Sequence, residues 1–309
     1  MEARKRLRQL VDAKEILVLP GAYDALSARL AEAAGFPCVY MTGYGQSASK
    51  LGQPDVGLMT MSEMAERAAD MVMAVNVPVI CDADTGFGNN VNVVRAIREY
   101  ERAGVAAIQL EDQTMPKKCG HMLGRDVIDA QEMVMKLKAA IAARTDPDFL
   151  IIARTDARTR YGIDEAIRRG KLYAEAGADV VFVESVESVE EMRRVNEEIP
   201  ARTIANMVET GRTPLLTAAE LQELGYDMVV FPISTLYVAA KAVHDMLVDL
   251  RANGTTRNYL DKMMSFSQFN DFIGLPLVRE LESNRFDGVE KKLRYAKRSG
   301  HLTDRDTII

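Results

Sequence analysis

The sequence predicts an α/β fold: a (β/α)₈ barrel of the TIM type with a helical extension at its C-terminus. Eight short apolar runs recur along the chain, with amphipathic helical patterns between them. The runs are rich in Val and Ile and do not alternate with polar residues, as expected of strands buried on both faces. In order, the predicted strands are residues 16–21, 38–43, 78–86, 106–113, 149–157, 180–185, 202–207 and 228–234.

The helical patterns lie between these runs, for example at residues 164–178 and 188–199. Several end in an Ala-Gly pair that is typical of a helix stop, at Gly35, Gly104 and Gly177. A doubly wound open sheet is the alternative, but no GxGxxG pattern follows the first run. From about residue 235 the pattern stays helical. We predict a single domain over residues 1–309, with the barrel at about 15–250 and the helical extension at about 251–309.

Composition narrows the class of protein. Hydrophobic residues make up 48% and charged residues 27%, which is typical of a globular domain. The net charge of −6 provides no basic excess for nucleic acid. No apolar run approaches the ~18 residues of a membrane span, and the charged first 15 residues lack the apolar core of a secretory signal. The three cysteines, Cys38, Cys81 and Cys119, form no even disulfide framework, so we expect reduced thiols and a cytoplasmic protein.

The carboxyl ends of five consecutive predicted strands carry polar side chains. They are Asp82, Asp84, Glu111, Asp112, Arg154, Asp156, Glu184 and Asn206. A single carboxylate at such a position often caps the next helix, but the same bias at five strand ends is not explained by capping. In a barrel the active site lies at these ends.

Four acids are expected to converge there: Asp82, Asp84 and Glu111, with Asp55 on the loop after the second strand. Carboxylates this close repel one another unless a cation lies between them. Oxygen ligands without His or Cys select Mg²⁺ or Mn²⁺ over Zn²⁺. We therefore predict a Mg²⁺ site with one direct carboxylate and the others bound through water.

Two further features are suited to a substrate carboxylate. Arg154 supplies a planar fork of donors for a substrate oxygen. The TGYG stretch at residues 42–45 combines a hydroxyl with backbone N–H groups, which can form a carboxylate cradle.

Residues 116–125, PKKCGHMLGR, follow the fourth strand and are predicted to form a lid over the barrel mouth. Cys119 is flanked by Lys117, Lys118 and His121. Positive neighbours are expected to lower the pKa of the thiol. A lone cysteine beside lysines is often inert, but its place above a cluster of acids favours catalysis.

Five segments together resemble the isocitrate lyase/phosphoenolpyruvate mutase superfamily, in its lyase branch with a KKCGH lid. They are KKCGH (117–121), DADTGFG (82–88), LEDQ (110–113), ARTDA (153–157) and ANMVETGRTP (205–214). The resemblance covers roughly residues 5–280. It implies a Mg²⁺-dependent barrel, usually a homotetramer, in which a C-terminal helix is swapped between subunits. Lyase members cleave a 2-hydroxy di- or tricarboxylate between C2 and C3.

The resemblance also implies roles for individual residues. Asp82 matches the direct Mg²⁺ ligand, while Asp55, Asp84 and Glu111 match partners that act through water. The segment that binds the pyruvyl carboxylate matches Tyr40, Thr42, Gly43 and Tyr44.

Catalysis is implied for Cys119 as the general acid that protonates the departing enolate, and for Arg154 beside the substrate oxygens. Further catalytic candidates on the lid are Lys117 and His121. Contacts to the rest of the substrate are implied for Gly120, Glu184, Asn206 and Thr213. The general base stays open between Tyr40 and a carboxylate acting through water.

One departure bears on the substrate. Methylisocitrate lyases resemble PLSxFR after the eighth strand, whereas this chain has PISTLY, with Tyr237 in place of the arginine. Without that charge a third carboxylate is poorly compensated. A smaller dicarboxylate such as 2,3-dimethylmalate or a 2-alkylmalate is favoured, and residues 206–214 and 254–270 also resemble the dimethylmalate lyase and petal-death branch. Arg212 is an alternative source of the missing charge.

The functional hypothesis is a Mg²⁺-dependent carbon–carbon lyase that releases pyruvate from such a dicarboxylate. The alternatives are a 2-methylisocitrate lyase that forms pyruvate and succinate, and a phosphonomutase of the carboxyphosphonoenolpyruvate type, against which the thiol lid argues. A non-catalytic protein that binds small acids is an alternative of another class, but no DNA-binding or signalling module supports it.

Overall fold

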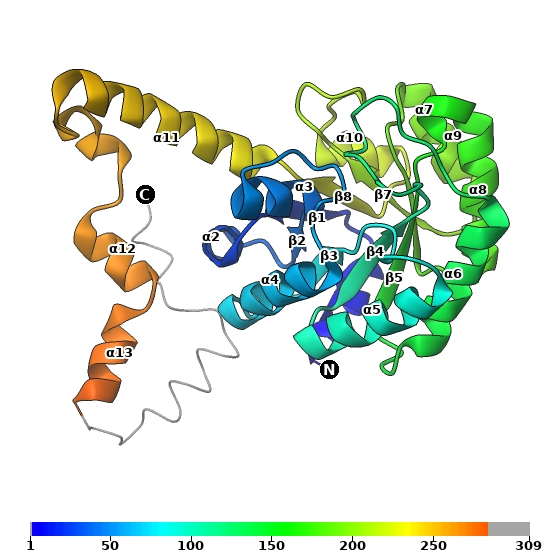
Figure 1. Ribbon diagram of the computed structural model, residues 1–309, viewed down its shortest axis with the longest axis horizontal. Coiled ribbons are helices and arrows are strands. Elements are labelled where there is room, and N and C mark those ends of the chain that lie inside the picture. Colours follow the sequence, from blue (N-terminus) through cyan, green and yellow to red (C-terminus); the bar gives the residue numbers. More distant parts are fainter. Residues whose placement is uncertain (1, 284–309) are drawn as a thin grey trace.

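The structure, a computed structural model, describes residues 2–283. Its centre is a closed barrel of eight parallel strands in sequence order, in which β1 pairs with both β2 and β8 (Figure 1). All eight predicted strands are present. They are β1 (Leu17–Ala22), β2 (Val39–Met41), β3 (Val79–Asp82), β4 (Ala107–Glu111), β5 (Leu150–Thr155), β6 (Val180–Val183), β7 (Arg202–Asn206) and β8 (Met228–Phe231).

Helices form the outer layer of the barrel, as the alternating pattern predicts. They are α2 (Ala25–Ala33), α4 (Met61–Ala74), α5 (Asn90–Ala103), α6 (Ala130–Ala143), α8 (Ile163–Glu175), α9 (Val189–Glu198) and α10 (Ala218–Glu223). The first helix, α1 (Glu2–Val11), instead packs Leu7 and Val11 into a cluster of strand residues. Shorter elements are α3 (Gly43–Gln46), the π-helical turn η1 (Ser47–Leu51) and α7 (Arg158–Tyr161). The predicted stop at Gly104 is confirmed, because this residue caps α5 with a φ of 89° that a side chain would disfavour.

Apolar side chains fill both sides of the strands. Leu19, Ile80, Ile152 and Phe182 belong to a cluster of strand residues that is completed by Leu7 of α1. The opposite strand faces pack against the helices. Most of the charged side chains of the barrel therefore lie at or beyond the strand ends.

The strand register sets those polar groups side by side. Asp82 at the end of β3 pairs with Gln109 of β4, and Glu111 at the end of β4 pairs with Arg154 of β5. Residues from three strands therefore meet at one rim of the barrel.

The chain leaves the barrel after β8 as an arm, which we define as residues 234–282. It comprises α11 (Ser234–Asn253), the 3₁₀ turn η2 (Arg257–Lys262), α12 (Phe266–Phe272) and α13 (Leu275–Glu282), and it projects away from the barrel (Figure 1). No residue of α11 is buried, so this helix does not cover the barrel as the preceding helices do. The predicted extension at about 251–309 begins within this arm, and its residues 284–309 lie outside the described part of the chain.

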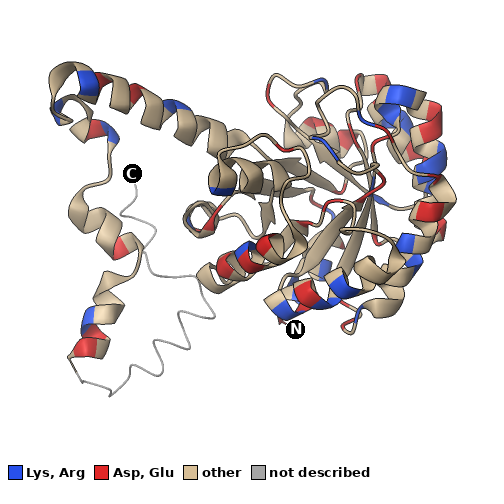
Figure 2. Cartoon of the chain, in the orientation of Figure 1, with Lys and Arg blue, Asp and Glu red and all other residues tan. Residues whose placement is uncertain are grey.

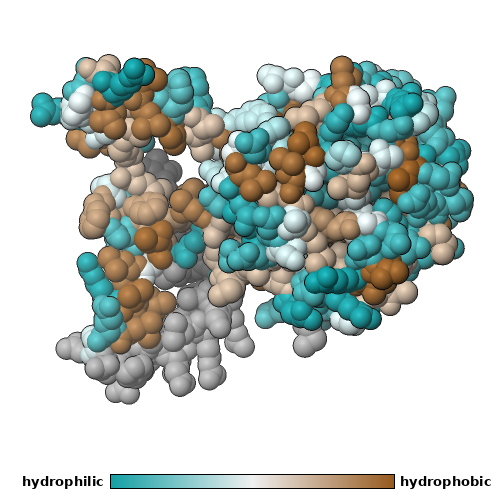
Figure 3. All heavy atoms as spheres, viewed as in Figure 1, coloured by the Kyte–Doolittle hydropathy of each residue, from teal (hydrophilic) through white to brown (hydrophobic). Residues whose placement is uncertain are grey.

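The outer surface carries lysines and arginines interspersed with acids along the helices (Figure 2). Apolar side chains gather along the arm (Figure 3). Among residues 2–283, no helix has the length and apolar character to cross a membrane.

Candidate active site

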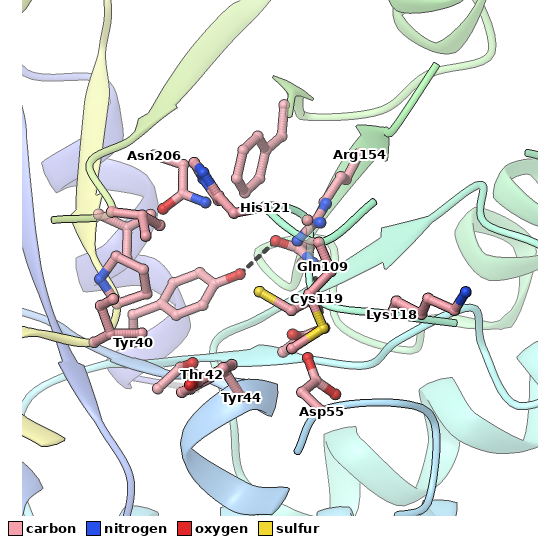
Figure 4. A pocket seen from close by; sticks show the side chains of 18 of the residues that line it. Tyr40, Thr42, Tyr44, Asp55, Gln109, Lys118, Cys119, His121, Arg154 and Asn206 are labelled. Carbon is pink, nitrogen blue, oxygen red and sulfur yellow. Dashed lines mark hydrogen bonds between the residues drawn. The ribbon is translucent and has the colours of Figure 1, made fainter. Parts of the chain in front are cut away.

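A pocket opens at the carboxyl ends of the strands, beneath the predicted lid (Figure 4). Most of the predicted site residues line it: Tyr40, Thr42, Tyr44, Asp55, Asp82, Lys117, Cys119, Gly120, His121, Arg154 and Asn206. The remaining ones are buried but do not line the pocket, namely Gly43, Asp84, Glu111, Glu184 and Thr213. The fold therefore gathers residues from seven strand ends and the lid around one cavity.

A hydrogen-bonded chain runs along the floor of the pocket. The Tyr40 hydroxyl donates to Oε1 of Gln109 at 2.5 Å, and Nε2 of Gln109 donates to Oδ1 of Asp82 at 3.2 Å. The backbone N–H of Gly43 donates to Oδ2 of Asp82 at 3.2 Å. A Cβ at Gly43 would lie 2.6 Å from that oxygen, so glycine is required for this approach.

Two contacts within the TGYG stretch differ from the sequence prediction of a free carboxylate cradle. The N–H of Gly43 contacts Asp82 rather than a free cradle, and that of Gly45 donates to Thr42 Oγ1 at 3.4 Å. Gln109 was not predicted as a site residue, although it is a polar residue within an apolar strand, which is a usable signal.

Lys117 lies between two of the predicted metal-site acids. Its Nζ is 2.8 Å from Oδ1 of Asp55 and 2.6 Å from Oδ1 of Asp84. Burial opposes the charge of the ammonium, but these carboxylates hold the pKa of Lys117 well above its usual value. Within residues 2–283, no three His, Cys, Asp or Glu side chains are grouped closely enough to hold a metal on their own. The acids thus share one end of the barrel, where an ammonium lies between two of them.

Glu111 has only a long ion pair with a cation among the described residues. Neither carboxylate oxygen accepts a hydrogen bond, although the side chain is buried, and the nearest guanidinium nitrogen of Arg154 is 3.5 Å away. Burial raises the pKa of Glu111 well above its usual value. This buried carboxylate has a long ion pair with Arg154 but no hydrogen bond, and it lies near Asp82 of the neighbouring strand. It fits a hard cation held by oxygen ligands and waters.

Arg154 is fixed by acids on two sides. Its Nε and Nη2 each donate to Asp156 at 2.9 Å, and Nη2 is 3.3 Å from Oε2 of Glu184. Burial opposes the charge, but Asp156, Glu184 and Glu111 hold the pKa of Arg154 well above its usual value. Its guanidinium also lies over the ring of Phe182 at 5.2 Å. The fork is therefore charged and oriented before any substrate binds.

The lid is closed against the barrel mouth. The N–H of Cys119 donates to the carbonyl of Asp55 at 3.0 Å, and the Ser185 hydroxyl donates to the carbonyl of Gly120 at 2.6 Å. A Cβ at Gly120 would lie 2.4 Å from Nη2 of Arg154, so only glycine allows this contact.

His121 fastens the same loop on another side. Its Nε2 is 3.1 Å from Oε1 of Glu184, and its Nδ1 accepts from the backbone N–H of Arg212 at 3.0 Å. Burial would raise the pKa of Glu184, but Arg154 and His121 hold it below the usual value, so the carboxylate is ionised.

The thiol environment corrects one expectation. Burial, with Asp55 and Glu184 nearby, raises the pKa of Cys119 to about 11. The expected cationic neighbours point elsewhere: Lys117 pairs with acids, and Nζ of Lys118 donates to the Gly124 carbonyl at 3.0 Å. The thiol is therefore neutral near pH 7, which is the form that donates a proton.

Two tyrosines and apolar side chains form another wall. The hydroxyls of Tyr44 and Tyr237 are 3.2 Å apart, and both residues line the pocket. Phe182, Val208 and Ile233 add apolar surface that the sequence pattern did not identify as part of the site. The guanidinium of Arg212 is 3.5 Å from Glu187 and does not line the pocket, so it does not replace the missing arginine here.

Comparisons with known proteins show which proteins this chain is similar to. The family model described as phosphoenolpyruvate phosphomutase matches residues 7–251. The chain is 58% identical to a 2,3-dimethylmalate lyase of Eubacterium barkeri over 93% of this chain and 100% of the relative. It is 46% identical to a 2-methylisocitrate lyase of Aeropyrum pernix over 87% of this chain and 86% of that protein.

Solved structures have the same fold. A crystal structure of 2,3-dimethylmalate lyase superposes with a TM-score of 0.85 at 38% identity, over 93% of this chain and 97% of that one. A phosphonopyruvate hydrolase in complex with oxalate and Mg²⁺ superposes with a TM-score of 0.84 at 32% identity, over 92% and 99% of the two chains.

Proposed function

The chain belongs to the phosphoenolpyruvate mutase/isocitrate lyase superfamily, and we propose that it is a Mg²⁺-dependent carbon–carbon lyase. Its substrate is a 2-hydroxy dicarboxylate of the 2,3-dimethylmalate or 2-alkylmalate type, and its products are pyruvate and a carboxylic acid. The observation that carries this proposal is the neutral Cys119 thiol, which the closed lid holds at the pocket opposite the acids of the strand ends. The lyase relatives support it independently.

The reaction separates two carbon atoms and moves two protons. The C2 hydroxyl loses its proton to a base and becomes the carbonyl of pyruvate. The C2–C3 bond breaks, and its electron pair forms the enolate of the departing acid. Cys119 donates its S–H proton to C3 of that enolate, and the resulting thiolate regains a proton from solvent.

The remaining residues orient the substrate. The fork of Arg154, fixed by Asp156 and Glu184, binds a substrate oxygen without reorganisation. The Tyr40 hydroxyl contributes as a donor rather than a base, because burial and Asp82 hold its pKa well above the usual value. A carboxylate acting through water is the better candidate for the general base.

The cofactor we propose is Mg²⁺, with Mn²⁺ as a substitute. Asp82 would bind it directly, and Glu111 would contribute through water, because both carboxylates are free of Lys117. Asp55 and Asp84, which pair with Lys117, would act at longer range. When bound, the cation supplies positive charge that stabilises the negative charge on the pyruvyl half.

The pocket wall that contains Tyr44 and Tyr237 favours a dicarboxylate substrate. Tyr237 and Tyr44 present hydroxyls where a third carboxylate would need a cation, and the neighbouring apolar side chains are suited to alkyl substituents. A 2-methylisocitrate lyase remains the second candidate, because a relative of that activity is 46% identical.

We also propose a homotetramer in which the arm packs on a neighbouring subunit. The arm leaves Val238, Leu260 and Phe266 exposed by 70%, 65% and 86%. A protein that stayed monomeric would expose this apolar face to water. The cytoplasmic location stays a prediction.

Release of the 2-oxo acid, followed with lactate dehydrogenase, tests the activity; this product is glyoxylate from isocitrate and pyruvate from the other three substrates. Purified protein with Mg²⁺ is assayed on 2,3-dimethylmalate, citramalate, methylisocitrate and isocitrate. We expect the highest kcat/KM with a dicarboxylate. Release from none of the four substrates would contradict a lyase, and a preference for methylisocitrate would support the second candidate.

A further inference from the structure

Arg125 is buried although it lies on a loop. It is the last residue of the lid, and its side chain is 1% exposed. Nη1 donates to the carbonyl of Met122 at 2.6 Å, and Nη2 donates to the hydroxyl of Thr159 at 2.6 Å. Its Nε lies 3.2 Å from Oδ1 of Asp156. One guanidinium thus joins the lid to itself, to α7 and to the end of β5.

Asp156 is shared between this arginine and the pocket arginine. The oxygen that faces Arg125 also accepts from Nη2 of Arg154 at 2.9 Å, and the other oxygen accepts from Nε of Arg154 at 2.9 Å. The backbone N–H of Asp156 donates to Oδ1 of Asp112 at 2.9 Å, which fixes the backbone that carries this carboxylate. The end of the lid and the substrate-facing fork therefore rest on one carboxylate.

The other lid contacts hold its N-terminal end and its tip, and Lys117 pairs with Asp55 and Asp84 at the N-terminal end. Cys119 and Gly120 contact the barrel through backbone atoms, and His121 contacts Glu184 and a backbone N–H. These contacts hold the tip of the lid, whereas Arg125 holds its C-terminal end with a permanent charge. Opening that end would leave the buried carboxylate of Asp156 with only one of its two cations, which is unfavourable at low dielectric.

We propose that Arg125 and Asp156 are positioning residues that latch the lid in its closed position and couple closure to the alignment of Arg154. The inference rests on the proposed function, because it assigns the lid a role in that reaction. Neither residue lines the pocket, so both act through Cys119 and Arg154 rather than on the substrate.

The test is the alkylation rate of Cys119 by iodoacetamide, with and without Mg²⁺ and pyruvate. Cys38 and Cys81 are both fully buried, so the fast-reacting thiol is that of Cys119. Its alkylation rate therefore reports how often the lid is open. In the wild type we expect Mg²⁺ with pyruvate to slow alkylation. In Arg125→Gln the alkylation rate of Cys119 in the presence of Mg²⁺ and pyruvate, which we call the protected rate, should rise roughly ten- to a hundredfold. This is the effect of losing a buried charged hydrogen-bond group.

Two further variants grade the effect. Arg125→Lys keeps the charge but cannot reach all three partners, so its protection should lie between those of the wild type and Arg125→Gln. Thr159→Val removes one acceptor and should raise the protected rate about two- to tenfold, even if Arg125→Gln does not fold. Combining Arg125→Gln with Asp156→Asn should give less than the product of the two single effects, since both remove one contact.

Arg4→Gln is the matched control. Arg4 is also buried and pairs with Asp146, but its Nε donates to the Val105 carbonyl before β4, at the opposite end of the barrel. It should lower the melting temperature without changing protection. If the Arg125 variants also keep full protection, the latch is wrong while the proposed function stands. If the wild type itself is not protected, the lid assignment of the proposed function fails and the latch fails with it.

Discussion

Replacing Cys119 by serine tests the proposed proton donor. Burial raises the pKa of the thiol to about 11, so at pH 7 only about one molecule in 10⁴ carries a thiolate. The acid form is thus almost fully populated. Titration of this thiol should therefore not change the turnover rate between pH 6 and about 9. A serine hydroxyl keeps the size of the side chain but is a much weaker acid. Turnover should fall by about 10²–10⁴, the range for losing a general acid.

The assay is pyruvate release at saturating Mg²⁺ and substrate, together with deuterium incorporation in D₂O. The wild type should place deuterium in one configuration on the carbon next to the new acid's carboxylate, because the lid donates from one face. In Cys119→Ser, any residual turnover should lose that preference, since solvent then protonates the enolate. Pyruvate should still bind, because Asp82 and Arg154 lie on the strands.

Cys38→Ala is the matched control, since Cys38 is buried in the core and does not line the pocket. It should retain turnover and stereochemistry. If Cys119→Ser keeps near-normal turnover with one deuterium configuration, then the thiol is not the donor. The lid would then only exclude water, and the acid would have to be sought elsewhere in the pocket.

Three further predictions follow from the same site and from the arm. EDTA should abolish activity and Mg²⁺ or Mn²⁺ should restore it, while Asp82→Ala should lose turnover with an unchanged circular dichroism spectrum; full activity in metal-free buffer would contradict the cofactor. Because Tyr237 carries no charge, kcat/KM should be higher for 2,3-dimethylmalate than for methylisocitrate, and a tenfold preference for methylisocitrate, about 1.4 kcal/mol, would refute this reasoning. Phe266 is 86% exposed, so Phe266→Glu should leave a monomer unaffected but dissociate a tetramer that covers it, and an unchanged mass by light scattering would contradict the proposed interface.

The barrel was predictable because each strand carries its own signal. Continuous apolar runs mark strands buried on both faces, and all eight appear in the structure within a few residues of their predicted bounds. The arm was less predictable. The sequence of α11 is amphipathic enough for a barrel helix, and only the structure shows that none of its residues is buried. Whether a helix packs on its own barrel or on another chain depends on tertiary contacts that local patterns do not contain.

Within the site, the sequence located residues better than it located their partners. Asp82, Cys119 and Arg154 line the pocket as predicted. Gln109 was missed because one polar residue does not interrupt a strand pattern, although it joins Tyr40 to Asp82. Apolar lining residues were missed for another reason: their side chains are indistinguishable in sequence from those of the core.

The lid shows why neighbours in sequence were misleading as electrostatic partners. Lys117 and Arg125 lie near its two ends, and each inserts its charge among barrel carboxylates: Lys117 between Asp55 and Asp84, Arg125 beside Asp156. These cations bind the lid to an acidic barrel mouth rather than lowering the pKa of the thiol between them. Because the acids hold the cations, burial dominates at Cys119 and keeps the thiol protonated. The same charges that close the lid thus leave its cysteine in the form that a general acid requires.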